Sequence, residues 1–131
     1  MASFIYDAAI DAVWQGDIAL DTDTVKMLLL TDDYVASQTA DAYVSSITTA
    51  ARVATTDALT SKSFTNAVFD AADPGISALT GNTVDAIAVF VDTGSDATSR
   101  LVSYHTVTPA YVPNGSDVVI SIPTTGIWGK S

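Results

Sequence analysis

Residues 84–107 read VDAIAVFVDTGSDATSRLVSYHTV, and this stretch decides the fold class. Its two ends, residues 84–91 and 100–107, are short apolar runs of the kind that form β-strands. The segment between them, residues 92–96, is rich in Asp, Gly and Ser, which favour turns. Two apolar runs joined by such a segment predict an antiparallel hairpin.

Three more short apolar runs follow the same plan. They occupy residues 63–69, 76–79 and 118–122, and Asp-Pro-Gly, Gly-Asn and Pro-Asn-Gly segments punctuate the chain between the runs. Short strands separated by turns at roughly ten-residue spacing are typical of sandwiches and jelly rolls. The sequence therefore predicts a mainly β fold, either a β-sandwich or a jelly-roll-like fold.

The composition agrees with one mainly β domain. The chain has 131 residues, 48% of them hydrophobic, which suits a single domain over residues 1–131. All 15 acidic residues are Asp, which prefers turns to helix interiors. The lack of cysteine excludes disulfide frameworks, thiol nucleophiles and thiolate metal sites.

The N-terminal segment is predicted to be a short helix over about residues 4–15. Ile5, Ala9 and Ala12 recur at helical spacing and belong to an apolar stripe. Ser3 is suited to cap the N-terminus of this helix, and Gly16 is suited to end it in the left-handed conformation.

Two segments follow before the β-rich remainder. Residues 24–31 read TVKMLLLT, a nearly continuous apolar run that predicts a strand buried on both faces. Residues 35–52 are rich in Ala, Ser and Thr and predict a loop that carries a short helix.

The charge of the chain disfavours two classes of partner. Its net charge of −10 repels phosphate backbones and anionic lipid, so we expect no nucleic acid and no membrane as partners. No apolar run approaches the ~20 residues of a membrane-spanning helix. Residues 1–7 contain no basic segment, so they do not resemble a secretory signal, and we expect synthesis in a cytoplasm.

Asp92-Thr93-Gly94 after two hydrophobic residues resembles the signature of aspartic proteases, in which two Asp side chains share one proton. A retroviral-type subunit needs a flap hairpin and a further strand after this Asp, and only 39 residues follow Asp92. We therefore favour a hairpin turn that Asp92 closes, and a hydrolase acting through Asp92 ranks third among the functions considered.

Other candidate sites are weaker. Ser103 and His105 share one strand face, but the ~6–7 Å between residues i and i+2 predicts that they are too far apart for a direct hydrogen bond. Asp21, Asp23 and the pair Asp32-Asp33 offer oxygen ligands, but the EF-hand pattern fails because Val25 follows Asp23 at the next ligand position. A weak Ca²⁺ or Mg²⁺ site built from several loops stays open. No Gly-rich phosphate loop is present, and we expect no cofactor.

Three segments of the chain resemble a known family. They are residues 16–34 (GDIALDTDTVKMLLLTDDY), residues 41–47 (DAYVSSI) and residues 88–102 (AVFVDTGSDATSRLV). Their order and character are similar to those of small tailed-bacteriophage virion proteins, a family of capsid decoration, cement or minor structural proteins. In that family the Asp-Thr-Gly segment is a hairpin turn. This chain departs from the pattern at residues 76–79, where relatives often carry a tryptophan strand, and at Arg100, where they carry proline.

The resemblance implies a structural function without catalysis and without catalytic residues. We expect a decoration or cement protein that is made in the host bacterial cytoplasm, binds the major capsid protein on the outside of the virion shell and stabilises contacts between capsomers. The alternative is a tail- or neck-associated minor assembly protein. A carbohydrate-binding β module ranks last, because aromatic residues make up only 8% of the chain.

The sequence also suggests how the protein associates. A small β domain exposes strand edges, so we expect a homo-oligomer, with a dimer favoured. Attachment to the shell would use buried apolar contacts or a locally basic patch of the shell, and we favour apolar contacts. Ile127 and Trp128 are the predicted anchor, and the competing interpretation is that Trp128 closes the protein's own core.

Overall fold

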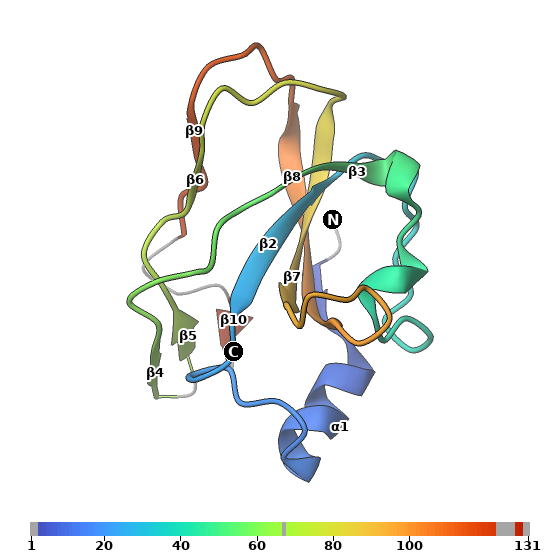
Figure 1. Ribbon diagram of the computed structural model, residues 1–131, viewed down its shortest axis with the longest axis vertical. Helices are drawn as coiled ribbons and strands as arrows, with labels where there is room; N and C mark the ends of the chain where they lie inside the picture. Colours follow the sequence, from blue (N-terminus) through green and yellow to red (C-terminus); the bar gives the residue numbers. More distant parts are fainter. Residues whose placement is uncertain (1–2, 67, 123–127, 130–131) are drawn as a thin grey trace.

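The computed structural model describes residues 3–66, 68–122 and 128–129 of the chain. Within these ranges the largest sheet has five antiparallel strands in the order β1-β8-β7-β2-β3. Figure 1 shows β2, β7 and β8 side by side in the middle of the molecule. The predicted hairpin and the predicted strand before it are confirmed. In sheet order, the strands are β1 (Ser3–Ile5), β8 (Arg100–Tyr111), β7 (Val84–Val91), β2 (Val25–Leu30) and β3 (Arg52–Thr55).

Two smaller sheets lie beside the large one, on the left in Figure 1. One contains β4 (Ser63–Thr65), β5 (Val68–Asp70) and β10 (Trp128–Gly129), and the other pairs β6 (Gly75–Ile76) with β9 (Val118–Val119). The chain is mainly β and its sheets are layered in a sandwich-like way, which confirms the predicted fold class.

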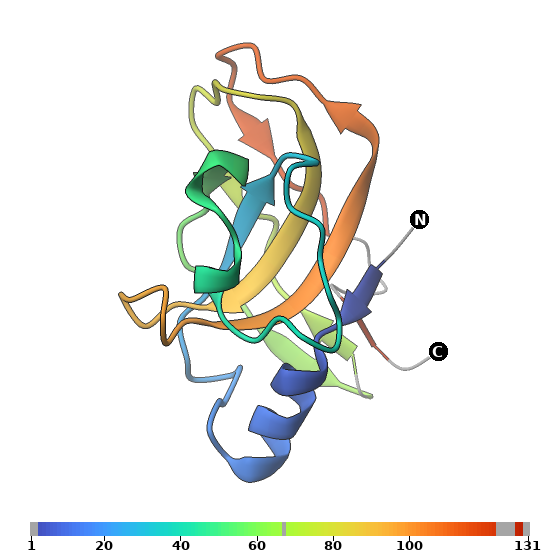
Figure 2. The same ribbon diagram turned by 90° about the vertical axis from the view of Figure 1, so that its right-hand side faces the viewer.

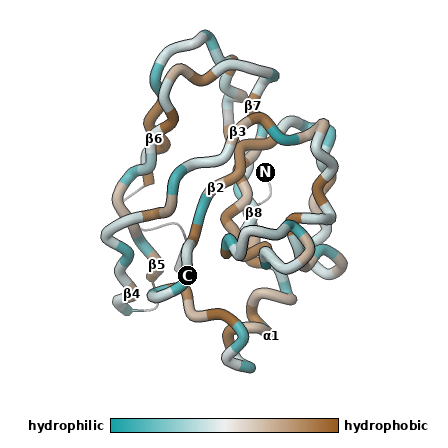
Figure 3. The backbone as a smooth tube through the Cα atoms, viewed as in Figure 1, coloured by the Kyte–Doolittle hydropathy of each residue, from teal (hydrophilic) through white to brown (hydrophobic). Residues whose placement is uncertain are grey.

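The five-stranded sheet packs against a buried cluster on each face. Alternate residues of its strands point to opposite sides, so one strand contributes to both clusters. On one face Leu28 and Phe90 belong to a buried cluster that the chain between β2 and β3 covers. On the other face Met27 and Val89 pack in a cluster with Phe69 of β5. Figure 3 shows hydrophobic residues along β2 and β7, the central strands that serve both clusters.

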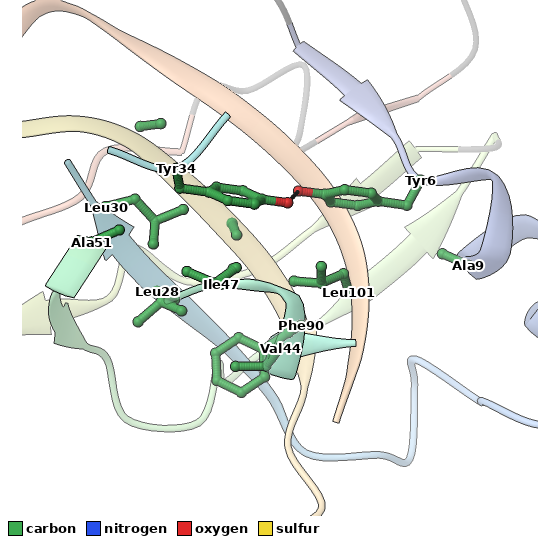
Figure 4. Close-up of a cluster of buried hydrophobic side chains, with 12 residues drawn as sticks. Tyr6, Ala9, Leu28, Leu30, Tyr34, Val44, Ile47, Ala51, Phe90 and Leu101 are labelled. Atoms are coloured by element: carbon green, nitrogen blue, oxygen red, sulfur yellow. Dashed lines mark hydrogen bonds between the residues drawn. The ribbon is translucent and has the colours of Figure 1, made fainter. Parts of the chain in front are cut away.

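The cover of the first face comes from the segment predicted as a loop with a short helix. It contains two 3-10 helices, η1 (Val44–Ser46) and η2 (Thr49–Ala51), which Figure 2 shows in front of the sheet. Figure 4 shows the hydroxyls of Tyr6 and Tyr34 meeting above this core. The two oxygens are hydrogen-bonded at 2.9 Å. The Tyr34 hydroxyl also donates to the Asp41 carboxylate at 2.6 Å. The polar atoms of both buried rings therefore have partners.

The N-terminal helix begins later than the sequence predicts. It is α1 (Asp7–Gln15), and Ser3 lies in β1, where it pairs with His105 of β8. The predicted cap at Ser3 is therefore wrong, because strand pairing with β8 holds Ser3 in an extended conformation. Gly16 ends the helix with φ of 78°, as predicted. Among the helices of the described ranges, none combines the length and hydropathy that a membrane crossing requires.

Three predicted strands are divided or shortened in the structure, whereas β8 continues beyond the predicted residue 107 to Tyr111. The run at 63–69 is a hairpin of β4 and β5, because Asn66 adopts φ of 54°, a left-handed turn conformation that Asn tolerates. The run at 76–79 keeps strand structure only in β6, since Ala78 has φ of 49° and its N–H donates to the Asp117 carboxylate. The run at 118–122 is shortened to β9.

Candidate functional site

The three segments that carry the family resemblance meet at one end of the five-stranded sheet. The Asp92 N–H donates to the Thr24 carbonyl at 2.8 Å, which joins the hairpin turn to the loop before β2. The Leu101 N–H donates to the Ala42 carbonyl at 3.0 Å, and the Val44 N–H to the Ser99 carbonyl at 2.9 Å. Segments that are distant in the sequence thus form one hydrogen-bonded unit.

Asp92 closes the turn between β7 and β8, as the sequence predicts. Its Oδ1 accepts from the Gly94 N–H at 2.9 Å, and its Oδ2 lies 2.7 Å from the Lys26 ammonium. The hydrogen bond from Lys26 and the one from Gly94 lower the pKa of this carboxyl. Asp92 is therefore ionised at neutral pH, with both oxygens engaged in the turn.

Arg100 holds residues 41–47 to the sheet. Its Nη2 donates to the Tyr43 hydroxyl at 3.0 Å, and its guanidinium carbon lies 4.8 Å from the centroid of the same ring. Its Nη1 reaches the Ala8 carbonyl of α1 at 3.5 Å. One side chain thus connects the start of β8 with Tyr43 and with the helix.

A polar cavity of about 470 Å³ opens between these segments. Its lining includes Asp17, Asp23, Tyr43, Asp92, Thr98 and Arg100. Asp23 uses Oδ2 to accept from the Ala19 N–H at 2.8 Å, so this carboxylate stabilises its own loop. The cavity is of small-molecule size, but Asp23, Asp92 and Arg100 already bond to other parts of the chain.

The acidic turns do not assemble a metal centre within the described residues. No group of three or more His, Cys, Asp or Glu side chains there is placed to hold a metal ion. Asp23 caps its own loop, and Asp32 and Asp33 lie exposed at the end of β2.

Ser103 and His105 are closer together than the strand spacing predicts. Ser103 Oγ and His105 Nε2 are 2.9 Å apart, so the prediction that they cannot bond directly is wrong. The ~6–7 Å spacing describes the backbone, whereas an imidazole is long enough to lean along the strand and reach its neighbour. Ser103 is fully buried, and burial lowers the pKa of His105. The pair is a partly buried hydrogen bond inside β8, and the buried Ser103 hydroxyl is not accessible as a nucleophile.

Trp14, which the sequence pattern did not mark as a site, is the largest exposed apolar side chain on the described surface. Its side chain is 82% exposed, although tryptophan is usually mostly buried. It lies beside an apolar groove of about 200 Å³. A signal was present in the sequence, because Trp14 follows Asp7 and Asp11 at helical spacing and so belongs to the polar face of α1. The groove is lined by Ile5, Ala9, Ile10, Val13, Trp14, Leu20 and Val102.

The predicted anchor residues are Ile127 and Trp128. Ile127 lies outside the described residues. The backbone of Trp128 is in β10 and pairs with Phe69 of β5.

Comparison of the chain with protein-family models finds no match, and comparison with curated proteins finds none either.

Proposed function

We propose that this chain is a structural protein of a tailed-bacteriophage particle that decorates the outside of the capsid shell and binds its major capsid protein. The observation that carries the proposal is the convergence of the three family-like segments at one end of the sheet. Each of these segments is hydrogen-bonded to another. If the resemblance reflects a shared structural role, the three segments are expected to lie together, as they do here. A chance resemblance carries no such expectation.

The chemistry of that unit suits a structural role. Asp92 is paired with Lys26 and closes a turn, and Arg52 bonds the Asp96 carboxylate at 2.7 Å in the same turn. Arg52 also donates to the carbonyls of Val44 and Ile47, which fixes the cover of the sheet. These paired charges thus hold the fold together and leave attachment to other surfaces.

The proposal is tested with shells assembled from the major capsid protein of the same genome. Purified chain is added to undecorated shells, and electron cryomicroscopy locates it, with shells of an unrelated phage as the control. We expect density on the outer surface at the capsomers. Binding only at the neck or tail of complete particles would favour the alternative of a minor assembly protein, and failure to bind either would refute the proposal.

A further inference from the structure

The outer face of α1 presents an apolar surface that the described chain does not cover. We call Ile10, Val13, Trp14 and the groove beside them the Trp14 surface. Trp14 is 82% and Val13 is 46% exposed, while the groove floor includes the buried Leu20 and Val102. An exposed indole beside a recess is the arrangement found at the centres of protein interfaces. The groove is smaller than the ~300–1,000 Å³ of small-molecule sites and has room for about one side chain.

Acidic residues lie close to this surface along the chain. Asp7 and Asp11 share a helix face with Trp14, because the three residues are spaced by four and three positions. Asp17 and Asp21 follow in the loop after α1, and all four Asp residues are exposed. Residues 1–25 contain no Lys, Arg or His. Trp14 also lies in the last turn of α1, next to the negative end of the helix dipole.

Two cations of the described chain are paired with carboxylates elsewhere, and two others bond to neutral groups near α1 and the loop after it, where they offset part of this negative charge. Lys26 pairs with Asp92, and Arg52 pairs with Asp96. Lys62 donates to the carbonyls of Leu20 and Asp23, and Arg100 is held by Tyr43 and Ala8. Four exposed Asp residues outnumber these two cations, so the Trp14 surface combines exposed apolar area with a net negative charge.

We propose that the Trp14 surface binds a basic segment of the partner protein, in which a Lys or Arg lies against the Trp14 indole and an aliphatic side chain enters the groove. A cation over an indole face is attracted to the ring, and here Asp11 and the C-terminal carbonyls of α1 add to the attraction. The inference rests on the proposed function for the identity of the partner, the shell protein. A second copy of this chain fits poorly, because it would bring the same acidic rim against this one.

The first experiment compares variants in shell binding. Trp14→Ala should weaken binding about 30-fold or more, as expected for a tryptophan anchor. The matched control is Val112→Ala, which removes part of another exposed side chain, 67% exposed, just beyond the end of β8. Because Trp14 is exposed, the variant should fold like the wild type by circular dichroism and urea denaturation. Shells that bind the wild type and Trp14→Ala equally would refute this inference and leave the proposed function standing.

The second experiment tests the charge of the partner. Asp11→Asn should weaken shell binding about 2- to 5-fold at 0.1 M salt, the range of an exposed ion pair, whereas Asp32→Asn, at an exposed Asp beyond β2, should not. The difference should vanish at 1 M salt, where the Debye length shrinks to ~3 Å. Stronger binding by Asp11→Asn at low salt would contradict a basic partner.

A third arm does not depend on shells. A synthetic Lys/Leu peptide should bind the wild type and Val112→Ala alike and bind Trp14→Ala more weakly, while a matched Glu/Leu peptide should not bind. Equal binding of the Lys/Leu peptide to wild type and Trp14→Ala would mean general attraction to a chain of net charge −10 and would refute the inference. If Trp14→Ala turned a dimer into a monomer in sedimentation, the occupant would be a second copy and the inference would be wrong.

Discussion

Some side chains of this protein bond two partners at once and so join segments that are distant in the sequence. Asp92 accepts a hydrogen bond from Gly94 within its own turn and pairs with Lys26 on the neighbouring strand β2. Tyr34 contacts both Tyr6 and Asp41, so one hydroxyl connects the N-terminal segment with the loop after β2. Because the partners of such residues are known, the effect of a substitution on stability can be predicted.

Replacing Asp92 by Asn should cost little stability at neutral pH. The amide oxygen can still accept from Gly94, and only the ion pair with Lys26 is lost, which contributes up to about 1 kcal/mol. The folded-state pKa of Asp92 is lowered, so the contribution of the ion pair is present above the unfolded pKa of 3.8 and is lost as pH falls through the folded pKa.

Urea denaturation of wild type and Asp92→Asn at pH 7 and again at about pH 2–3 checks this prediction. The difference between the two proteins should shrink at the lower pH. Unfolding of the variant at pH 7, or a peptidase activity in the wild type that Asp92→Asn abolishes, would contradict the structural role of Asp92.

His105 should make stability depend on pH near neutrality. Burial lowers its pKa, so the unfolded chain takes up a proton below its value of 6.5 more readily than the folded protein does. The free energy of unfolding should therefore fall as pH decreases through 6.5 and level off below the folded-state pKa. Denaturation between about pH 7.5 and pH 5.5 measures this, and His105→Gln should show a smaller fall. An identical fall in both proteins would assign the effect to another group.

At the scale of elements, helix α1 is defined more clearly at its end than at its start. Gly16 has a left-handed φ of 78° and its N–H donates back to the Val13 carbonyl. Tyr6 occupies the N-cap without a side-chain capping bond in the described structure, and its own N–H donates to Val102 of β8. Strand pairing, not capping chemistry, therefore decides where the helix begins.

Substitution of Gly16 should destabilise the protein through its backbone conformation alone. A Cβ built at Gly16 meets no atom of the described structure within 4 Å, so Gly16→Ala adds no steric clash but forces a side chain into the left-handed region, at about 1 kcal/mol. Gly16→Asn should lose less, because Asn tolerates this conformation. Thermal or urea denaturation ranks the three proteins. A Gly16→Ala variant as stable as the wild type would refute the conformational argument.

At the scale of the whole molecule, the described edges of the large sheet and the charge of the surface shape association. β1 and β3 form these edges, and the only charged residue of β3, Arg52, is bonded to Asp96 and to two backbone carbonyls. Its charge is therefore directed into the protein and does not guard the edge. The acidic surface near α1, by contrast, repels a second copy.

We predict that the isolated protein forms a dimer through the β3 edge and that Trp14→Ala leaves this dimer intact, because β3 and the Trp14 surface lie at opposite edges of the sheet. Sedimentation velocity at micromolar concentration measures the oligomeric state of both proteins. A strict monomer across that range would show that the edges are protected by other means.

The sequence by itself determined the features that depend on neighbours along the chain. The period of apolar residues identified β2, β7 and most of β8, and turn chemistry identified the role of Asp92 and of Gly16, because both signals are complete within a few residues. The mainly β fold class follows from the same local signals.

Only the tertiary structure decided the features that depend on residues far apart in the chain. Phe4 stacks on Tyr104 and draws the N-terminal residues into strand β1, although their sequence pattern also suits a helix. The convergence of the family-like segments, the contact between Ser103 and His105, and the groove that makes Trp14 a candidate anchor depend on how the strands pair and how α1 packs on β8. Local preference is weak at such positions, so burial of apolar surface between distant segments determines the outcome.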